Sequence, residues 1–180
     1  MENVKMLRMY TMETVNIKIL RMYDDVKLPS KTKENAGFDI YANFEEDYII
    51  IMPHESKLIP TGFKTVIPPT HYAQIFERGS SGVQNLKFNA GVIDSGFRGE
   101  WKVCLYNGND VPVVIAKNSY DCSDVQFTFY DTFIVYPYEK AIAQFVVLPV
   151  PNTTIEEVTE EEFNQYTSER GEGMLGSSNK

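Results

Sequence analysis

The sequence predicts an all-β fold of the jelly-roll type, a β-barrel or sandwich of short strands that ends in an extended C-terminal arm. Three observations support this fold class. β-Branched and aromatic residues gather in many short runs. Gly, Pro, Asn and Asp punctuate the gaps between these runs. No long stretch shows helical periodicity. Many short strands separated by turn signals are typical of a sandwich or jelly roll.

The first expected strand is Val15–Leu20, where apolar residues alternate. Around Trp101, apolar side chains alternate with Lys102 and Cys104, which indicates a half-buried strand. The acidic segment Ile155–Tyr166 is the one candidate helix. The remaining runs are expected strands: Tyr48–Ile51, Phe63–Ile67, Tyr72–Phe76, Trp101–Leu105, Val111–Ile115, Val125–Phe129, Phe133–Val135 and Ile142–Leu148.

Length, charge and cysteine usage bound the function. A chain of 180 residues is long enough for one domain with a real core. A net charge of -8 argues against nucleic-acid binding and requires that any polyanion be held by local Arg and backbone N–H groups or by a cation. Cys104 and Cys122 lack the spacing of a zinc site. No signal peptide or membrane span is visible, so we expect a cytoplasmic protein that binds no membrane.

The chain is expected to have three parts. Residues 1–11 form an N-terminal extension, in which Lys5–Tyr10 is echoed by Lys18–Tyr23 and Met12 is a plausible alternative start. Residues 12–150 hold the strands, and residues 151–180 form the arm, which is acidic and then rich in Gly and Ser. Two copies of a motif are too few for a solenoid.

Four segments carry candidate chemistry, although each alone is also compatible with a plain turn or strand. They are Ala36–Ala42, Arg78–Gly82, Gly91–Glu100 and Lys140–Gln144. Arg78–Gly82 combines a cation, two hydroxyls and two glycines, a composition suited to an anion nest. Gly91–Glu100 is expected to be a strand-turn-strand hairpin that places a carboxylate three residues before an aromatic ring.

Together with the arm at Arg170–Ser178, these segments resemble, in order, the five motifs of the trimeric dUTPase family. The resemblance runs from about Val15 to the C-terminus. It implies a jelly roll of the dUTPase type, a homotrimer whose active sites take residues from more than one chain, and hydrolysis of dUTP to dUMP and pyrophosphate, which limits uracil in DNA.

The third motif supplies the catalytic residue in this resemblance. Asp94 matches the carboxylate that activates water for attack on the α-phosphorus. Phe97 matches an aromatic position that packs under the deoxyribose and excludes a 2′-hydroxyl. Backbone groups around Asn89, Gly91 and Ile93 match the uracil pocket.

The resemblance also implies the phosphate contacts. Arg78, Gly79, Ser80, Ser81 and Gly82 match the phosphate motif, with Gly79 an extra residue that leaves open which serine touches phosphate. Gln144 matches a further phosphate contact, and Mg²⁺ is expected to bind mainly through the triphosphate and waters. Asp39 is a candidate for an outer-shell or a structural role, with the structural role favoured.

In the fifth motif the arm is expected to close over the nucleotide. Arg170, Gly176, Ser177 and Ser178 would cover the phosphates. The family usually has Phe at the position of Leu175, so this chain departs from the aromatic stacking on uracil.

The stretch of about Asn118–Tyr136 reads as an insertion rich in aromatic residues between the third and fourth motifs. Phage-type dUTPases resemble this chain in having an insertion there, and some use it to bind regulatory proteins. One interpretation is an added hairpin that buries its rings on its own subunit. The other is a surface that binds a regulatory protein.

Two alternative functions stay open. A non-enzymatic nucleotide-binding regulatory protein would act through the insertion. A dCTP deaminase shares the fold and a similar hairpin, but its catalytic Glu would fall at Cys104.

Overall fold

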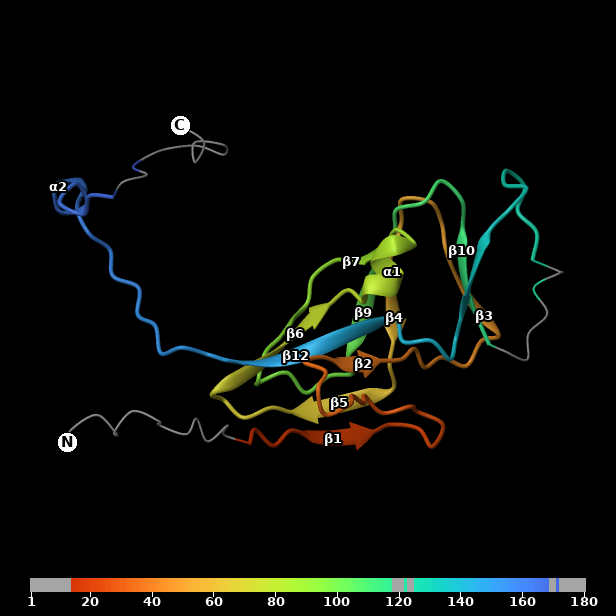
Figure 1. The fold of residues 1–180 in the computed structure, drawn as a ribbon, viewed down its shortest axis with the longest axis horizontal. Coiled ribbons are helices and arrows are strands. Elements are labelled where there is room, and N and C mark those ends of the chain that lie inside the picture. The colour runs from red at the N-terminus through yellow and green to blue at the C-terminus, as the bar shows by residue number, and fades with distance from the viewer. Residues whose placement is uncertain (1–13, 118–121, 123–124, 169–170, 172–180) are drawn as a thin grey trace, which may run out of the picture. The chain divides into compact units, whose positions relative to one another are not determined.

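The computed structural model describes residues 14–117, 122, 125–168 and 171 (Figure 1). The chain divides into two compact units, Met1–Val150 and Pro151–Lys180. The proposed extension at residues 1–11 lies outside the described residues. The first unit contains the strands and α1, and the second contains the short helix α2, Glu160–Phe163.

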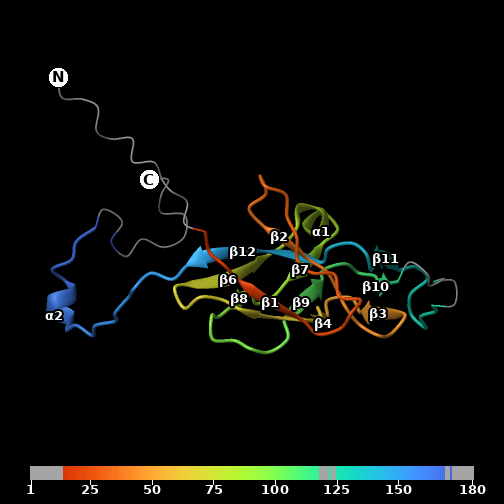
Figure 2. The same cartoon turned by 90° about the horizontal axis from the view of Figure 1, so that it is seen from below.

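The largest sheet among the described residues has four strands in the order β2-β12-β6-β8. Their bounds are Phe38–Ile40, Ala143–Pro149, His71–Phe76 and Val92–Ile93. All three pairings are antiparallel, and β12 and β6 are the central strands. Figure 2 shows β12, β6 and β8 in one layer. This sheet connects the first four motif segments, because each lies on one of its strands or directly follows one.

Three further sheets complete the first unit within the described residues. β1 (Lys18–Arg21) pairs with β5 (Phe63–Val66). The order β4-β9-β7 joins Ser56–Pro60, Lys102–Asn107 and Leu86–Phe88. The order β11-β10-β3 joins Ile134–Pro137, Val113–Ala116 and Tyr48–Ile51. Packed layers of short strands are the jelly-roll-like, all-β architecture that the sequence predicts.

The core is built around one indole. Trp101 is fully buried and packs against Phe63 and Phe145, with ring centroids 5.2 and 5.0 Å apart. Its Nε1–H donates to Thr65 Oγ1 at 3.0 Å, and Thr61 Oγ1 donates to the Trp101 carbonyl at 2.7 Å. A buried indole N–H needs a partner of this kind. The core therefore ties β5 and β12 to the start of β9.

Most expected strands are observed within two or three residues of their predicted bounds, but Val125–Phe129 is not a strand. Val125 instead packs in a small cluster with Val114 and Ala116 of β10, a strand that is already paired on both sides with β3 and β11. The hairpin, one of the two interpretations of Asn118–Tyr136, is not found in the described residues of that segment. β11 pairs with β10 in parallel, so the connection between them is a crossover.

Two short helices complete the structure that is described. α1 spans Gly79–Val83, packs beside β7 and was not predicted, because its Gly and Ser residues have low helix propensity (Figure 1). α2 lies inside the predicted helical segment, and its N-cap Thr159 accepts a hydrogen bond from the Glu162 N–H. None of the helices in the described residues is long and apolar enough to cross a membrane.

Candidate active site

Residues from three motifs meet on one side of the four-stranded sheet. In the pairing register, Gln144 on β12 stands opposite Asp39 on β2 and opposite Phe76 on β6. Arg78 follows β6, and its Nε donates to Asp39 Oδ1 at 2.9 Å while Nη2 donates to Oδ2 at 3.3 Å. This fork geometry fixes the guanidinium plane. Both side chains are about a third exposed or less, so the group remains open to a ligand.

The Gln144 side chain forms a hydrogen bond to one backbone segment and lies close to the backbone of another. Its Nε2 donates to the Glu77 carbonyl at 2.7 Å. A Cβ at Gly37 would lie 2.6 Å from Gln144 Oε1, so the glycine of the first motif makes room for the glutamine of the fourth. The Gln144 amide is therefore fixed beside Arg78.

The serines of the second motif differ in environment. Ser80 is exposed, and its Oγ accepts a hydrogen bond from Arg78 Nη1 at 3.3 Å. Ser81 is 1% exposed, and its hydroxyl contacts the Tyr136 hydroxyl at 3.3 Å. A Cβ at Gly79 or Gly82 would meet no atom of the described residues within 4 Å beyond its chain neighbours and the backbone of α1. The space beside both glycines is therefore open.

The third motif forms an exposed turn. The Phe97 N–H donates to the Asp94 carbonyl at 3.0 Å, and the Asp94 side chain is exposed. The Phe97 ring lies against Gly99, where an added Cβ would come within 2.6 Å of it, and the residue is 43% exposed. Arg98 Nη1 donates to the Ser95 and Phe97 carbonyls at 2.6 and 2.9 Å. The turn thus presents a carboxylate and an aromatic face together.

The strands on the two sides of the segment around Asp94, β7 and β9, pair antiparallel as in a hairpin. Within that segment, β8 pairs instead with β6 of the four-stranded sheet. Of the predicted uracil-binding positions, Asn89 donates its N–H to the Cys104 carbonyl, Gly91 accepts from the Ile75 N–H, and Ile93 stands opposite Ala73. These three residues therefore bridge two sheets.

The Asp94 turn and the Arg78 group lie far apart within one chain. β2 and β8 are the opposite edges of the sheet, three strand spacings or roughly 14 Å apart. Along β6, Ala73 stands opposite Ile93, and Arg78 comes five residues later, roughly 16 Å further on. The ion pair directs Arg78 toward β2, away from β8. One chain therefore presents two separate groups of motif residues.

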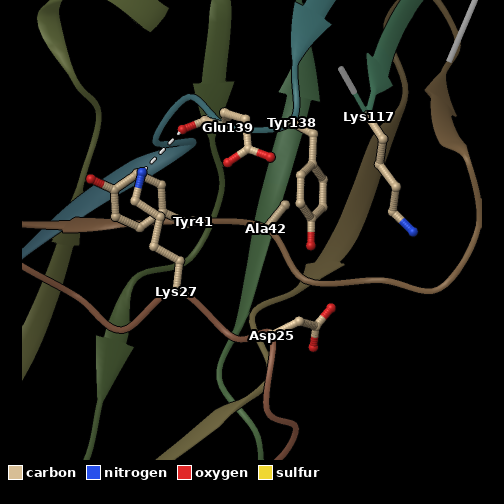
Figure 3. Close-up of a pocket in the computed structure, with 7 residues that line it drawn as sticks. All are labelled: Asp25, Lys27, Tyr41, Ala42, Lys117, Tyr138 and Glu139. Carbon is tan, nitrogen blue, oxygen red and sulfur yellow. Dashed lines mark hydrogen bonds between the residues drawn. The ribbon is translucent and has the colours of Figure 1, made fainter. Parts of the chain in front are cut away.

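A separate pocket opens beside the end of β11 (Figure 3). It has a volume of ≈ 470 Å³ and contains none of the motif side chains predicted to bind substrate. Lys27 Nζ lies 3.7 Å from the centroid of the Tyr41 ring and donates to the Glu139 carbonyl at 3.4 Å. Burial, reinforced by the charge of Asp25, raises the pKa of Tyr138 above its usual value. The wall of this pocket therefore combines charged and aromatic groups.

Two parts of the predicted site fall partly or wholly outside the described residues. The arm residues Arg170, Leu175, Gly176, Ser177 and Ser178 are among them, as are residues 118–121 and 123–124 of the proposed insertion. In the described part of that segment, Phe127 packs against Tyr130 and Phe133, whereas Phe129 is 89% exposed. The segment thus buries some rings on its own subunit and exposes at least one.

Sequence reasoning missed the role of Tyr136. It was grouped with the aromatic residues of the insertion, yet its hydroxyl lies next to Ser81 of the phosphate motif. No local pattern could have shown this contact, because it joins residues 55 positions apart.

These features define a class of protein: an all-β protein with an arginine-centred group suited to binding an anion and a separate turn that carries a carboxylate. Comparison with known sequences places the chain within that class. A family model described as dUTPase matches residues 25–120, which is more than half of the chain. A deoxyuridine 5'-triphosphate nucleotidohydrolase of Wolbachia pipientis is 32% identical over 170 residues, covering 92% of this chain and 95% of the relative. The chain belongs to the dUTPase family.

Solved structures show the same fold. The dUTPase of Staphylococcus bacteriophage 80alpha, solved with dUpNHpp, matches with a TM-score of 0.68 at 20% identity, covering 92% of this chain and 99% of that one. Phage dUTPases are described there as controlling transfer of virulence genes. A mutant dUTPase of Staphylococcus aureus phage phi11, described as coordinating a structural Mg(II) ion, matches with a TM-score of 0.64 at 22% identity, covering 81% of this chain and 97% of that one.

Proposed function

We propose that this protein is a dUTP diphosphatase, which hydrolyses dUTP to dUMP and pyrophosphate. The observation that carries the proposal is the pair of half-sites on a chain of the dUTPase family: an Arg78 group for phosphates and an Asp94 turn for water and sugar. The first binds anions through charge-assisted hydrogen bonds. The second supplies a base beside an aromatic face.

Asp94 is the proposed general base. Its exposed carboxylate accepts a hydrogen bond from a water molecule and orients it for attack on the α-phosphorus, while pyrophosphate leaves. Phe97 packs its exposed face under the deoxyribose and leaves no room for a 2′-hydroxyl. The segment through Asn89, Gly91 and Ile93 reads the uracil edge.

Arg78, Ser80 and Gln144 are the proposed side-chain contacts to phosphate. The exposure of Ser80 and the burial of Ser81 favour Ser80 as the serine whose hydroxyl touches phosphate. The open space at Gly79 and Gly82 lets backbone N–H groups approach oxygen atoms closely. Asp39 acts structurally, because its carboxylate fixes the Arg78 guanidinium.

The described residues fit a Mg²⁺ ion held through the substrate. No group of three His, Cys, Asp or Glu side chains in that part of the chain could hold a metal, so most ligands would come from the triphosphate and water. When bound, Mg²⁺ would neutralise phosphate charge.

The separation of the two half-sites supports a homotrimer with shared active sites. A triphosphate bound at Arg78 does not reach Asp94 of the same chain, because Arg78 follows the far end of β6, five residues or roughly 16 Å beyond the residue that stands opposite Ile93. A second chain that presents its Asp94 turn to the first chain's Arg78 completes the site. Arg170, Gly176, Ser177 and Ser178 of the arm then cover the phosphates, and Leu175 covers the base.

A second, regulatory function is favoured by Phe129. This ring is 89% exposed and lies in the segment of about Asn118–Tyr136. Exposed aromatic residues are enriched among binding hot spots, so a regulatory protein could bind there. Deamination has no such support, since Cys104 stands where that chemistry needs a carboxylate and lies in β9 opposite Leu58.

Pyrophosphate release from dUTP with Mg²⁺ tests the proposed function, with dCTP, dTTP and UTP as comparison substrates. We expect release from dUTP alone and a loss of at least about a hundredfold in kcat for Asp94→Asn, which keeps the shape of the side chain but removes the base. Binding of dUTP by the wild type without any release would contradict the enzymatic proposal and favour the regulatory one.

A further inference from the structure

The hydroxyl of Tyr136 is a buried junction, because it forms hydrogen bonds to two different segments of the chain. Tyr136 lies on β11, at the end of the aromatic segment, and is 1% exposed. Its hydroxyl donates to the Ala141 carbonyl at 2.6 Å, in the turn that precedes β12. Lys140 Nζ lies 5.5 Å from the centroid of its ring. The phenol therefore fixes the turn between β11 and β12.

The second contact of this hydroxyl has a defined direction. A phenol has one hydrogen, and that of Tyr136 is used on Ala141. In the 3.3 Å contact between the two hydroxyls, Ser81 is therefore the donor and Tyr136 the acceptor. Ser81 is also 1% exposed, so water does not compete for this bond.

The two partners of Tyr136 belong to the two elements that carry the phosphate contacts. Ser81 is part of α1, which begins directly after Arg78 and contains Ser80. Ala141 lies three residues before Gln144. One oxygen atom thus sets the position of α1 relative to β12. Misplacing a binding group by about 1 Å is enough to weaken its contribution.

We infer that Tyr136 is a positioning residue for phosphate binding, which acts by holding α1 and the start of β12 in register. The inference rests on the proposed function of α1 and Gln144. It also means that β11, the strand that ends the segment of about Asn118–Tyr136, is joined to the phosphate site by a direct hydrogen bond. A displacement of β11 would therefore shift or break the hydrogen bond that positions α1.

Tyr136→Phe removes the junction and keeps the ring. We expect the KM for dUTP to rise about five- to tenfold with kcat within about twofold of wild type, since the loss is in phosphate binding. Inhibition by deoxyuridine, which has no phosphate, should be unchanged. A purely structural role would lower the folded fraction, and hence the kcat calculated from total protein, at an unchanged KM.

Two further variants make the test specific. Tyr138→Phe is the matched control: it removes a hydroxyl two residues away that accepts a hydrogen bond from Asn43 Nδ2 at 3.4 Å, and we expect wild-type kinetics at neutral pH. Ser81→Ala breaks the same bond from the other side and should raise KM as Tyr136→Phe does. The double variant should raise the KM no more than either single variant does, because both substitutions remove the same hydrogen bond.

Titration of each variant with dUpNHpp measures binding without turnover. Weaker binding by Tyr136→Phe and Ser81→Ala, with Tyr138→Phe equal to wild type, supports the inference. Wild-type KM and wild-type affinity in both Tyr136→Phe and Ser81→Ala would overturn it while leaving the proposed function intact. A wild type that binds dUpNHpp but does not hydrolyse dUTP would contradict the proposed function, and the affinities would still decide the role of Tyr136.

Discussion

At the scale of single residues, small side chains decide what the motif side chains can do. Gly37 leaves room for Gln144, and Gly99 leaves room for the Phe97 ring, so both glycines are explained by contacts within the chain. Gly79 is different, because an added Cβ would meet nothing within 4 Å in the described residues beyond its chain neighbours and the backbone of α1. The proposed phosphate site gives a reason for the missing side chain, since a phosphate would occupy the adjacent space.

Gly79→Ala should therefore weaken substrate binding without lowering the stability of the fold. The free energy of unfolding should stay unchanged or rise by up to about 1 kcal/mol, because Ala favours helix over Gly. The KM for dUTP should rise, because the new methyl group occupies the space next to the phosphates. Thermal or urea unfolding and steady-state kinetics measure the two effects.

Gly108→Ala is the matched control for that variant. An added Cβ there would lie 2.6 Å from Asn85 Oδ1, so we expect lower stability with an unchanged KM. If Gly79→Ala also left KM unchanged, the proposal that phosphate approaches this backbone would be wrong.

Tyr138 gives a pH prediction. Burial and the nearby Asp25 raise its pKa, so the folded state holds the phenol proton more tightly than the unfolded state. The resulting stabilisation is present below the unfolded pKa of 10.0 and is lost as the pH rises through the folded pKa. As the pH rises above about 9, the free energy of unfolding of Tyr138→Phe should therefore fall less than that of the wild type. Parallel pH profiles of the two proteins in chemical denaturation would refute this assignment.

At the scale of elements, the aromatic segment is divided between packing and exposure. Phe127 contacts Tyr130 and Phe133, with ring centroids 6.2 and 5.7 Å apart, and packs against the small cluster formed with Val114 and Val125. Phe129 is 89% exposed. The same segment can therefore support its own subunit and present a ring to a partner.

Phe127→Ala should lower the free energy of unfolding by about 1–2 kcal/mol, less than for a fully buried ring because Phe127 is half-buried. Phe129→Ala should change it by less than about 0.5 kcal/mol. Urea denaturation measures both changes. Equal effects of the two substitutions would contradict the described packing of the segment. Phe129→Ala is consequently the variant to use when testing a partner.

The sequence predicted most of the strands because β-branched runs bounded by turn residues report local preference directly. It failed where pairing decides the structure. Val125–Phe129 has a strand pattern but pairs with no strand in the described residues. Around Asp94, β7 and β9 pair as in a hairpin, yet the intervening β8 pairs with β6, and no local sequence pattern shows that choice of partner. The contact of Ser81 with Tyr136 could not be predicted either, because it joins residues 55 positions apart.

At the scale of the whole molecule, the sheet order supports the proposed assembly. Arg78 is directed to the β2 edge, and Asp94 follows β8 at the opposite edge. Closed symmetry lets each chain give one half-site to a neighbour and receive the other half-site from another neighbour. We therefore propose that dUTP is hydrolysed at a site whose phosphate-binding group and base come from different chains.

Mixing two inactive variants tests that claim most directly. Asp94→Asn and Arg78→Ala chains are each purified, then co-refolded at equal amounts, and pyrophosphate release from dUTP is measured. In mixed trimers a site is intact when one neighbour supplies Asp94 and the other supplies Arg78, so random assembly should restore about one quarter of wild-type activity. A mixture no more active than the two variants alone, despite proven exchange of chains, would contradict the claim and place both residues in the site of a single chain.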